Sequence, residues 1–306
     1  MNEFRLKVDK TVRHYAKKIK VNIRSAWWNY SRPAADHPIF IVSGSRSGTQ
    51  MLYKTLSESR EIGTLQREIY DVWDSLHHPS DKNWDTHTLN ADDASQHDRD
   101  TITRYFYAHT GKTRFVDKNN QHGLSVPYLQ ALFPDATFVY IKRSPGDTLN
   151  SMIEGWSKPE RSEWSKALPD KIAVDEGVYT RWCFFLFEGW RSFQQARVED
   201  VCAIQYRTIH SAILEAKKNI PASQWLEVFY EDIFTNPVVE IRSLFNQLGL
   251  TFDERIENHA TNLLSKPYDP LYEIRLDKWR DSPHKTRIEH VLPGLNDIAQ
   301  AMGYTP

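Results

Sequence analysis

An apolar, strand-like run at residues 38–43 leads directly into a turn rich in Gly and Ser, and few folds join these two features. The turn carries Arg46, and an amphipathic helical pattern begins at residue 49. Backbone N–H groups at a helix start, the positive end of the helix dipole and one fixed cation converge at such a turn. The sequence therefore predicts a binding site for a phosphate-like anion.

The turn departs from the pattern of magnesium-dependent nucleotide triphosphatases. That pattern requires four residues between its glycines, then a lysine and a hydroxyl side chain that holds magnesium. Here three residues separate Gly44 from Gly48, the cation precedes the second glycine, and Gln50 stands where the hydroxyl is sought. The strand candidate at 137–142 ends in basic residues rather than in the acid that completes a magnesium site. We expect a bound phosphate or sulfate group and no metal.

The turn resembles the 5′-phosphosulfate loop of sulfotransferases that use 3′-phosphoadenosine 5′-phosphosulfate (PAPS). Two positions depart from the family pattern, since Ser45 stands where proline is common and Gln50 where threonine is more frequent. Neither change removes the backbone donors. On this resemblance the 5′ end of the cofactor contacts Gly44, Ser45, Arg46, Ser47, Gly48, Thr49 and Gln50.

Three later stretches resemble further elements of the same family, in the same order. Residues 139–151 are similar to its 3′-phosphate element, with Arg143 at the strand end and Ser151 about two helical turns later. Residues 225–250 resemble its strand, acidic turn and helix near the C-terminal third. Lys278 and Arg280 resemble its late cofactor-covering loop, so the resemblance implies that Arg143, Ser151, Lys278 and Arg280 also bind the cofactor. It spans roughly residues 37 to 304.

The resemblance also implies the catalytic residues, which are Glu68, Lys118 and Arg46. Glu68 resembles the glutamate that takes the proton of the acceptor, and Lys118 resembles the lysine that stabilises the developing charge. Asp117 either orients Lys118 or caps the helix that follows. Sulfuryl transfer needs such a base and cations around the leaving phosphate, and it can proceed without a metal.

Short apolar strands alternate with longer helical patterns, which predicts an α/β fold in three layers, with a mostly parallel central sheet, helices on both faces and a P-loop-like phosphosulfate loop. The predicted strands are 38–43, 61–66, 113–117, 137–142 and 225–230. The predicted helices are 49–59, 101–110, 122–133, 146–156, 175–198, 203–218, 236–248 and 286–302. Residues 157–174 are predicted to form a mobile surface loop near the acceptor. Because ligands bind beyond the carboxyl ends of parallel strands, one edge can gather Arg46, Glu68, Lys118 and Arg143.

Residues 1–32 form a predicted basic amphipathic helix that precedes a single domain at 33–306. This segment holds nine Lys or Arg against two acidic residues, a net charge of +7. Its apolar residues recur every three or four positions, as on one helix face, and are Phe4, Val8, Val12, Tyr15, Ile19 and Ile23. The helix either contacts an anionic membrane surface or packs on the domain with its basic face in water. We favour the second arrangement.

The opposite charge bias occurs in residues 68–100, part of an insertion expected around 68–110 on the acceptor side. Nine acidic residues stand against Lys82 and Arg99, a net charge of −7 apart from histidine, and aromatic residues are interleaved. An acidic and aromatic wall favours a small-molecule or sugar-like acceptor, including a cationic one. A merely solvated polar insertion remains the alternative.

Other residue types carry less information about function. No pair among His77, His78 and His87 has the spacing of a zinc motif, and Cys183 lies in an aromatic run that is typical of a core. Two cysteines give no disulfide framework, and no apolar run reaches the length of a membrane span, so we expect a cytoplasmic protein without a nucleic-acid partner.

Together these features predict a sulfotransferase that moves a sulfuryl group from PAPS to a hydroxyl, or an amine, of a small natural product or carbohydrate. Adenosine 3′,5′-bisphosphate (PAP) is then the second product. The alternatives are a P-loop kinase acting on a small metabolite and a nucleotide-binding protein without catalytic activity.

Overall fold

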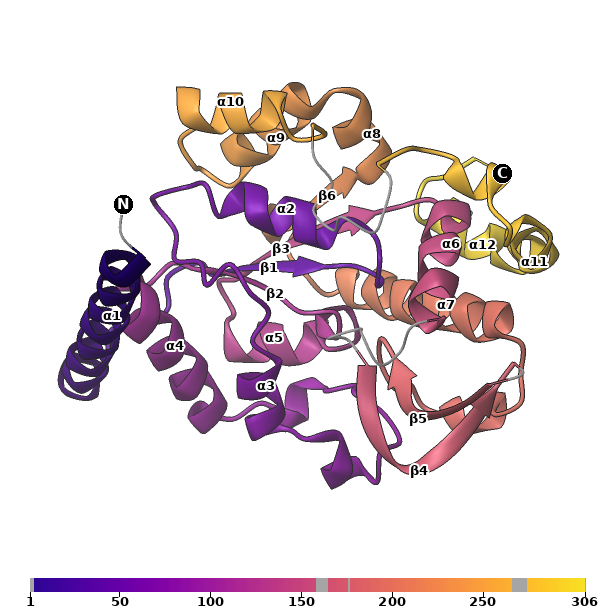
Figure 1. Ribbon diagram of the computed structural model, residues 1–306, viewed down its shortest axis with the longest axis horizontal. Coiled ribbons are helices and arrows are strands. Elements are labelled where there is room, and N and C mark those ends of the chain that lie inside the picture. Colours follow the sequence, from indigo (N-terminus) through magenta and orange to yellow (C-terminus); the bar gives the residue numbers. More distant parts are fainter. Residues whose placement is uncertain (1–2, 158–164, 176, 266–273, 306) are drawn as a thin grey trace.

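The computed structural model describes residues 3–157, 165–175, 177–265 and 274–305, with the backbone alone at 3–11, 13, 14, 165 and 166. Four parallel strands form the central sheet in the order β2-β1-β3-β6 (Figure 1). Their bounds are β1 Ile39–Val42, β2 Val116–Lys118, β3 Thr137–Lys142 and β6 Trp225–Phe229. All four strands therefore end at the same edge of the sheet.

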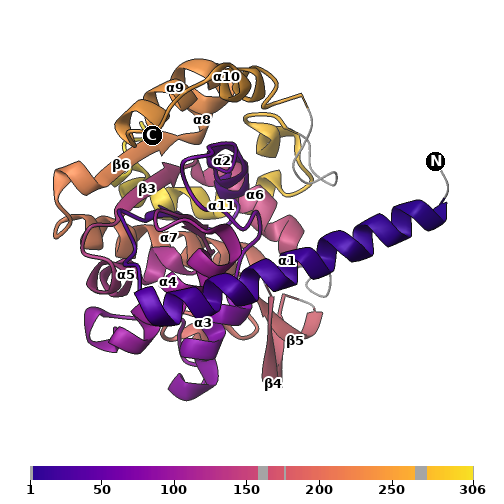
Figure 2. The same ribbon diagram turned by 90° about the vertical axis from the view of Figure 1, so that its left-hand side faces the viewer.

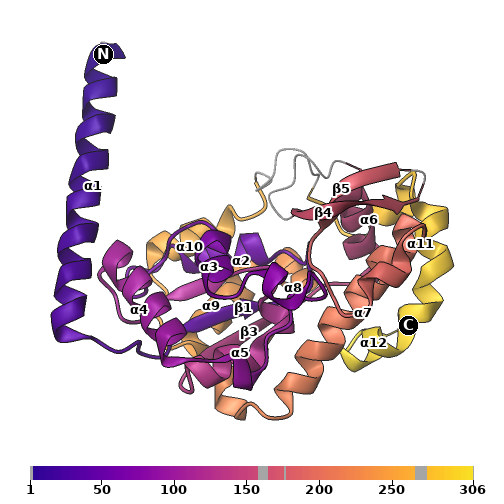
Figure 3. The same ribbon diagram turned by 90° about the horizontal axis from the view of Figure 1, so that it is seen from below.

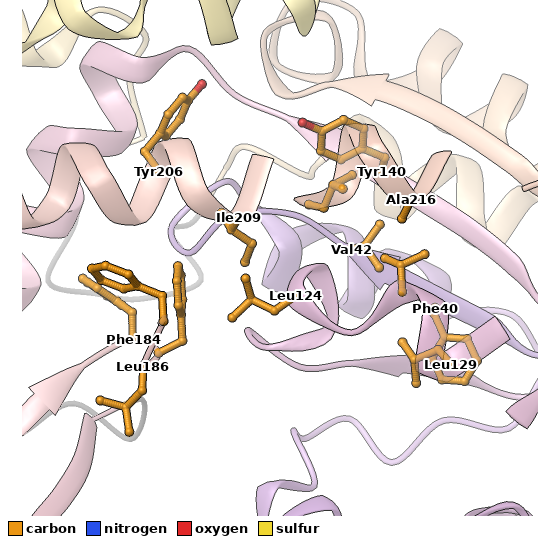
Figure 4. Packing of buried hydrophobic residues seen from close by; sticks show 14 of the residues in the cluster. Phe40, Val42, Leu124, Leu129, Tyr140, Phe184, Leu186, Tyr206, Ile209 and Ala216 are labelled. Atoms are coloured by element: carbon orange, nitrogen blue, oxygen red, sulfur yellow. The ribbon is translucent and has the colours of Figure 1, made fainter. Parts of the chain in front are cut away.

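Alternate residues of each strand pack on opposite faces, as the two-residue period of a strand requires. Ile39 and Ile41 belong to the cluster that includes Leu52 and Leu244, under α2 (Thr49–Leu56), α8 (Tyr230–Thr235), α9 (Pro237–Gln247) and α10 (Glu254–Thr261). Phe40 belongs to the opposite cluster, which α5 (Val126–Leu132) and α7 (Val198–Lys217) cover (Figure 4). The predicted fold class, a parallel sheet between two helical layers, is confirmed.

Further helices surround these layers. They are α3 (Tyr70–Leu76), α4 (Gln96–Thr110), α6 (Pro145–Trp156), α11 (Lys285–Val291) and α12 (Asn296–Ala301). Short 3-10 turns are η1 (Pro79–Lys82), η2 (Ala91–Asp93), η3 (His122–Leu124), η5 (Trp190–Phe193), η6 (Ala222–Gln224), η7 (Lys278–Asp281) and η8 (Leu292–Leu295).

The predicted helix at 175–198 is wrong. Residues 177–183 form β5 (Gly177–Cys183), which pairs antiparallel with β4 (Ser165–Val174), and β4 replaces the second half of the loop predicted at 157–174. Residues 158–164 of that loop lie outside the described residues. Burial alternates along the first part of β5, and its β-branched and aromatic residues suit a half-buried strand. Cys183 is buried as predicted, at the end of a strand rather than in a helix.

The strand predicted at 61–66 is reduced to a single parallel bridge between Gly63 and Phe115. The chain leaves the sheet after this bridge, and Gln66 adopts a left-handed conformation with φ 55°. The segment that carries Glu68 therefore lies beside β2 as a loop.

The N-terminal segment forms one long helix, α1 (Glu3–Ser31). The C-terminal end of α1 packs against α4, and the rest of the helix extends beyond the body of the molecule (Figures 2 and 3). Among the apolar residues predicted to pack on the domain, Val12, Tyr15, Ile19 and Ile23 are instead exposed. The side chains of Phe4 and Val8 lie outside the described residues. Within the described chain, no helix combines the length and apolarity needed to cross a bilayer.

Candidate active site

The loop at 43–48 follows β1 and lies against α7. A Cβ atom at position 44 would lie 2.7 Å from Nε2 of His210, a buried residue of α7. Such a contact is too short for a real side chain, so only glycine lets the loop approach the helix this closely. The hydroxyl of Tyr140 on β3 lies 2.6 Å from Nδ1 of the same imidazole. Burial lowers the pKa of His210 to about 3, so the imidazole that contacts the loop is uncharged at neutral pH.

The loop then enters α2 through two left-handed residues. Gly48, with φ 86°, is the N-cap of α2, and a Cβ there would lie 2.4 Å from the ring of Tyr230. Arg46 adopts φ 68°, which an L-residue with a long side chain rarely does and which costs about 1 kcal/mol or more. Strained backbone of this kind persists where surrounding contacts fix it, and it is frequent at ligand sites.

Two hydroxyl groups in the loop suit an anionic ligand. The Oγ atoms of Ser45 and Ser47 are buried, and neither has a hydrogen-bond partner among the described residues. Buried hydroxyls in proteins normally have hydrogen-bond partners, so two unsatisfied ones in one loop suggest that a ligand supplies the missing acceptor oxygens. Together with the N–H groups at the start of α2, they fit the phosphosulfate end of PAPS.

Arg46 joins this loop to the predicted 3′-phosphate element. Its Nε donates to the Oγ of Ser151 on α6 at 2.9 Å, and its backbone carbonyl accepts a hydrogen bond from Nη1 of Arg143 at 2.9 Å. Ser151 and Arg143 therefore both contact Arg46 in the loop that follows β1, Ser151 at the Arg46 side chain and Arg143 at the Arg46 backbone carbonyl.

Arg143 is buried, and two tyrosine side chains contact it. Its guanidinium carbon lies 4.4 Å from the ring centroid of Tyr230, and its backbone carbonyl accepts from the hydroxyl of Tyr206 at 2.9 Å. Nε of Arg143 is buried and has no partner within the described part of the chain. This unsatisfied donor, on a cation already in place, fits an anionic ligand group such as the 3′-phosphate.

A second cation, Lys278, approaches this cluster from η7. Its Nζ lies 3.7 Å from Oε2 of Glu154. The pKa of Lys278 is lowered, first by burial and then by nearby Arg143 and Arg46, while Glu154 opposes the shift. Arg280, also a predicted cofactor residue, is exposed; its guanidinium packs on Trp279 and pairs with Asp277.

Asp147 positions η7, a role that the sequence did not reveal. Its carboxylate is buried and accepts hydrogen bonds from the backbone N–H groups of Asp277 at 2.8 Å and Trp279 at 3.3 Å. The ring of Trp279 lies directly against Gly146, where a Cβ would be 2.4 Å from the indole nitrogen. The first turn of α6 thus holds the segment that carries Lys278.

Glu68 and Lys118 form an ion pair at the end of β2, in which Lys118 is buried and Glu68 is partly buried. Nζ of Lys118 donates to Oε1 of Glu68 and, at 3.2 Å, to Oδ1 of Asn120. Oε2 of Glu68 is buried and has no hydrogen-bond partner in the described residues. One carboxylate oxygen is therefore held by the lysine, while the other is available to accept a proton.

The loop that carries Glu68 is fixed by Tyr53 of α2. The Tyr53 hydroxyl accepts from the N–H of Leu65 at 3.2 Å and donates to the carbonyl of Arg67 at 3.4 Å. Burial, together with the charge of Asp117, raises the pKa of Tyr53 to about 12, so this hydroxyl keeps its proton. The amphipathic pattern of α2 predicts that Tyr53 is buried but does not predict that its hydroxyl binds the backbone of the loop that carries Glu68.

Asp117 takes neither of its predicted roles. Its Oδ2 accepts from Nε1 of Trp73 at 2.8 Å and lies 3.0 Å from Nε2 of His122, and its Oδ1 has no partner among the described residues. Asp117 is fully buried and fixes α3 against the end of β2, beside Lys118.

A pocket of about 60 Å³ lies beside this strand end. Its walls come from residues 73–89 of the acidic, aromatic segment and from residues 119–129. They are Trp73, Asp74, His77, His78, Pro79, Asp81, Lys82, Thr86, His87, Leu89, Asn119, Gln121, His122, Ser125, Tyr128 and Leu129. The volume suits one functional group of a ligand rather than a whole drug-sized molecule.

The clustered histidines make specific hydrogen bonds. Nε2 of His77 lies 2.9 Å from a carboxylate oxygen of Asp98, and Nδ1 of His87 accepts from the N–H of Leu186 at 2.7 Å. Among the described residues, the potential metal-ligating atoms that lie close together belong to Asp36, His37 and Asp135. This exposed group precedes β1 and β3, at the opposite edge of the sheet from the candidate site.

The structure thus gathers the predicted residues, except the exposed Arg280, into two adjoining groups. The first surrounds loop 43–48 and includes Arg46, Arg143, Ser151 and Lys278; the second is the Glu68–Lys118 pair. Thr49 and Gln50 lie in the first turn of α2, directly after the loop.

Residues 38–254 match a sequence model described as the sulfotransferase family. No curated protein matches the chain significantly. A sulfotransferase from Mycobacterium avium, STF9, superimposes with a TM-score of 0.54 at 13% identity, covering 91% of this chain and 81% of that one. The sulfotransferase domain of the Synechococcus PCC 7002 olefin synthase gives a TM-score of 0.50 at 16% identity, covering 89% and 96%. A sulfotransferase from Alicyclobacillus acidocaldarius gives 0.50 at 16% identity, covering 89% and 98%.

Proposed function

Since the chain belongs to the sulfotransferase family, we propose that it transfers a sulfuryl group from PAPS to a hydroxyl group of a small-molecule acceptor. The observation that carries this proposal is the set of contacts among Arg46, Ser151 and Arg143, which joins the two elements that we propose bind the phosphate groups. A nucleotide with phosphate groups at both its 5′ and 3′ positions matches such a paired site.

The residues around loop 43–48 would hold the two ends of the nucleotide. The hydroxyls of Ser45 and Ser47 and the N–H groups at the start of α2 suit the 5′ end, beside Arg46. Arg143 and Ser151 suit the 3′-phosphate, and Lys278 adds a third positive charge. When bound, PAPS supplies the activated sulfuryl group.

Glu68 is the base in this proposal. Its Oε2 accepts the proton from the acceptor hydroxyl, while Lys118 holds Oε1 and fixes the direction of the carboxylate. As the acceptor oxygen bonds to sulfur, the bond between sulfur and the 5′-phosphate oxygen breaks, and negative charge develops on that phosphate. In this proposal Lys118 and Arg46 stabilise that charge.

The acceptor binds, in this proposal, on the side formed by residues 68–100. The pocket beside β2 is lined by Asp74 and Asp81 together with aromatic and imidazole rings, which favours a polar or cationic group. A small natural product or a sugar-like alcohol fits these walls better than an acidic acceptor, because acidic groups would meet like charge.

Two measurements test the proposal. Calorimetry should detect binding of PAP, and incubation with PAPS and a panel of alcohols, sugars and amines should give products heavier by one sulfuryl group. Binding of ATP with magnesium in place of PAP would support a kinase and reject the proposal. Binding of PAP without transfer to any acceptor of the panel would support a non-catalytic nucleotide-binding protein.

A further inference from the structure

Helix α1 exposes a continuous apolar face. The residues of this face recur every three or four positions, and their exposed fractions range from 56% for Trp27 to 86% for Tyr30. We call them the α1 stripe: Val12, Tyr15, Ile19, Ile23, Trp27 and Tyr30. Elsewhere in the described chain the exposed large apolar residues are Val178 and Val239, so the exposed apolar surface is concentrated on this helix.

The helix is attached to the domain through a different side. Trp28 is buried and donates from Nε1 to the carbonyl of Pro33 at 3.2 Å. Ser25 accepts a hydrogen bond from Arg104 of α4 at 2.9 Å, and Arg24 donates to the carbonyl of His109 at 3.4 Å. These residues lie on the last turns of α1, and the remaining turns extend past the body (Figures 2 and 3). These contacts lie on the side of α1 opposite Ile19 and Ile23.

Basic residues flank the α1 stripe. Lys18 and Lys20 are exposed and, at about 100° per residue, lie on opposite sides of Ile19. Lysines at these edges can extend toward phosphate groups while the apolar face is buried. Trp27 and Tyr30, whose ring centroids are 5.8 Å apart, are the residue types that favour the level of the lipid headgroups.

We propose that α1 binds the surface of an anionic membrane, with the α1 stripe facing the acyl chains and the flanking lysines facing lipid phosphates. The net charge of +7 in residues 1–32 favours an anionic membrane as the binding partner of this face. A second copy of the chain would place two equally basic helices together, and their repulsion opposes such a pairing. The helix lies along the surface, because its polar side excludes a spanning arrangement.

Vesicle sedimentation of the full chain tests this proposal. Vesicles of phosphatidylcholine with about one third phosphatidylglycerol should bind the protein at least about tenfold more strongly than pure phosphatidylcholine vesicles. The double variant Ile19→Ser/Ile23→Ser should lose most of this binding at unchanged charge. Val239→Ser, which alters an equally exposed valine on α9, is the matched control and should bind as the parent does.

The charge contribution needs its own variant. Lys17→Gln/Lys18→Gln/Lys20→Gln should remove most of the preference for anionic vesicles. Brominated acyl chains should quench tryptophan emission of the parent more than that of Trp27→Phe. Unchanged circular dichroism and PAP affinity would establish that the variants fold, since these residues lie outside the candidate active site.

Several outcomes would overturn the proposal. They are an absence of parent binding to anionic vesicles, and equal binding by Ile19→Ser/Ile23→Ser and the parent. Light scattering that detects a dimer which the same double variant dissociates would identify a second copy as the occupant instead.

Discussion

Nη1 of Arg143 donates a hydrogen bond to the backbone carbonyl oxygen of Arg46 at 2.9 Å, across 97 residues of sequence. The contact joins the end of β3 to the loop after β1 and fixes a left-handed residue in that loop. One guanidinium therefore orders the loop and, in the proposed function, also contacts the 3′-phosphate.

Replacing this guanidinium should weaken nucleotide binding. Arg143→Lys keeps the positive charge but loses the planar guanidinium whose Nη1 donates to the Arg46 carbonyl. We therefore expect PAP affinity, measured by calorimetry, to fall about 10- to 100-fold. Arg242→Lys is a matched control, because Arg242 lies over the ring of Phe252 at the same 4.4 Å as Arg143 over Tyr230, away from the site. Equal affinities in both variants would contradict this role of Arg143.

Glu68→Gln should reduce turnover by about 10²- to 10⁴-fold, since an amide cannot take the acceptor proton. PAP affinity should change little, because the amide oxygen can still accept from Lys118. Single-turnover transfer with PAPS and an identified acceptor measures the first effect, and calorimetry measures the second. Glu58→Gln, which changes a surface partner of Arg255, should leave both unchanged. Turnover at the parent rate would exclude Glu68 as the base.

Asp147→Asn should loosen η7 without unfolding the protein. The amide keeps one acceptor oxygen and loses the other, so the N–H of Asp277 or Trp279 is left without its bond. We expect faster hydrogen exchange at these two amides and PAP binding weaker by about tenfold. Asp253→Asn makes the same carboxylate-to-amide change at the N-cap of α10, where one oxygen accepts a single N–H, so as the control it should leave both quantities unchanged. Unchanged exchange at both amides would rule out the positioning role.

Gly44→Ala should destabilise the loop, because the new methyl group would lie 2.7 Å from His210. Overpacking of this kind typically costs about 1–3 kcal/mol in the free energy of unfolding. Gly294→Ala adds the same methyl group where nothing lies within 4 Å and should be nearly neutral. Denaturant unfolding compares the two, and equal stabilities would show that the loop does not press on α7 as described.

His210 should make the protein less stable in mild acid. Its pKa is about 3 in the folded state, below that of an unfolded histidine, so the unfolded chain binds the extra proton as pH falls. Stability should decline below about pH 6.5 with a slope of up to about 1.4 kcal/mol per pH unit from this residue, until the folded pKa is reached. His210→Asn should make the profile shallower in this range. Parallel profiles for parent and His210→Asn would refute the assignment.

The sequence predicted the central sheet well because residues 39–42 and 137–142 are mostly apolar runs, each followed by a short turn that leads into a helix. It also placed Lys118 and Arg143 at strand ends, where parallel pairing brings them to one edge. The hairpin was missed, since the apolar run around Cys183 suits either a helix or a strand, and the partner strand decides between them.

Tertiary contacts account for the other differences. The positioning role of Asp147 could not be predicted from local sequence, because its contact with Asp277 spans 130 residues. The α1 stripe has the period of a packed helix face, yet α1 uses Trp28 and Ser25 to contact the domain. Periodicity identifies an apolar face but does not say what covers it.

The close approach of Arg46, Arg143 and Lys278 has a practical consequence for the purified enzyme. Three cations near one another raise the electrostatic free energy of the folded state, and any small dianion that enters the loop relieves it. Shelf life and heat resistance should therefore depend on the choice of buffer salt, with sulfate or phosphate protecting the protein better than chloride at equal ionic strength.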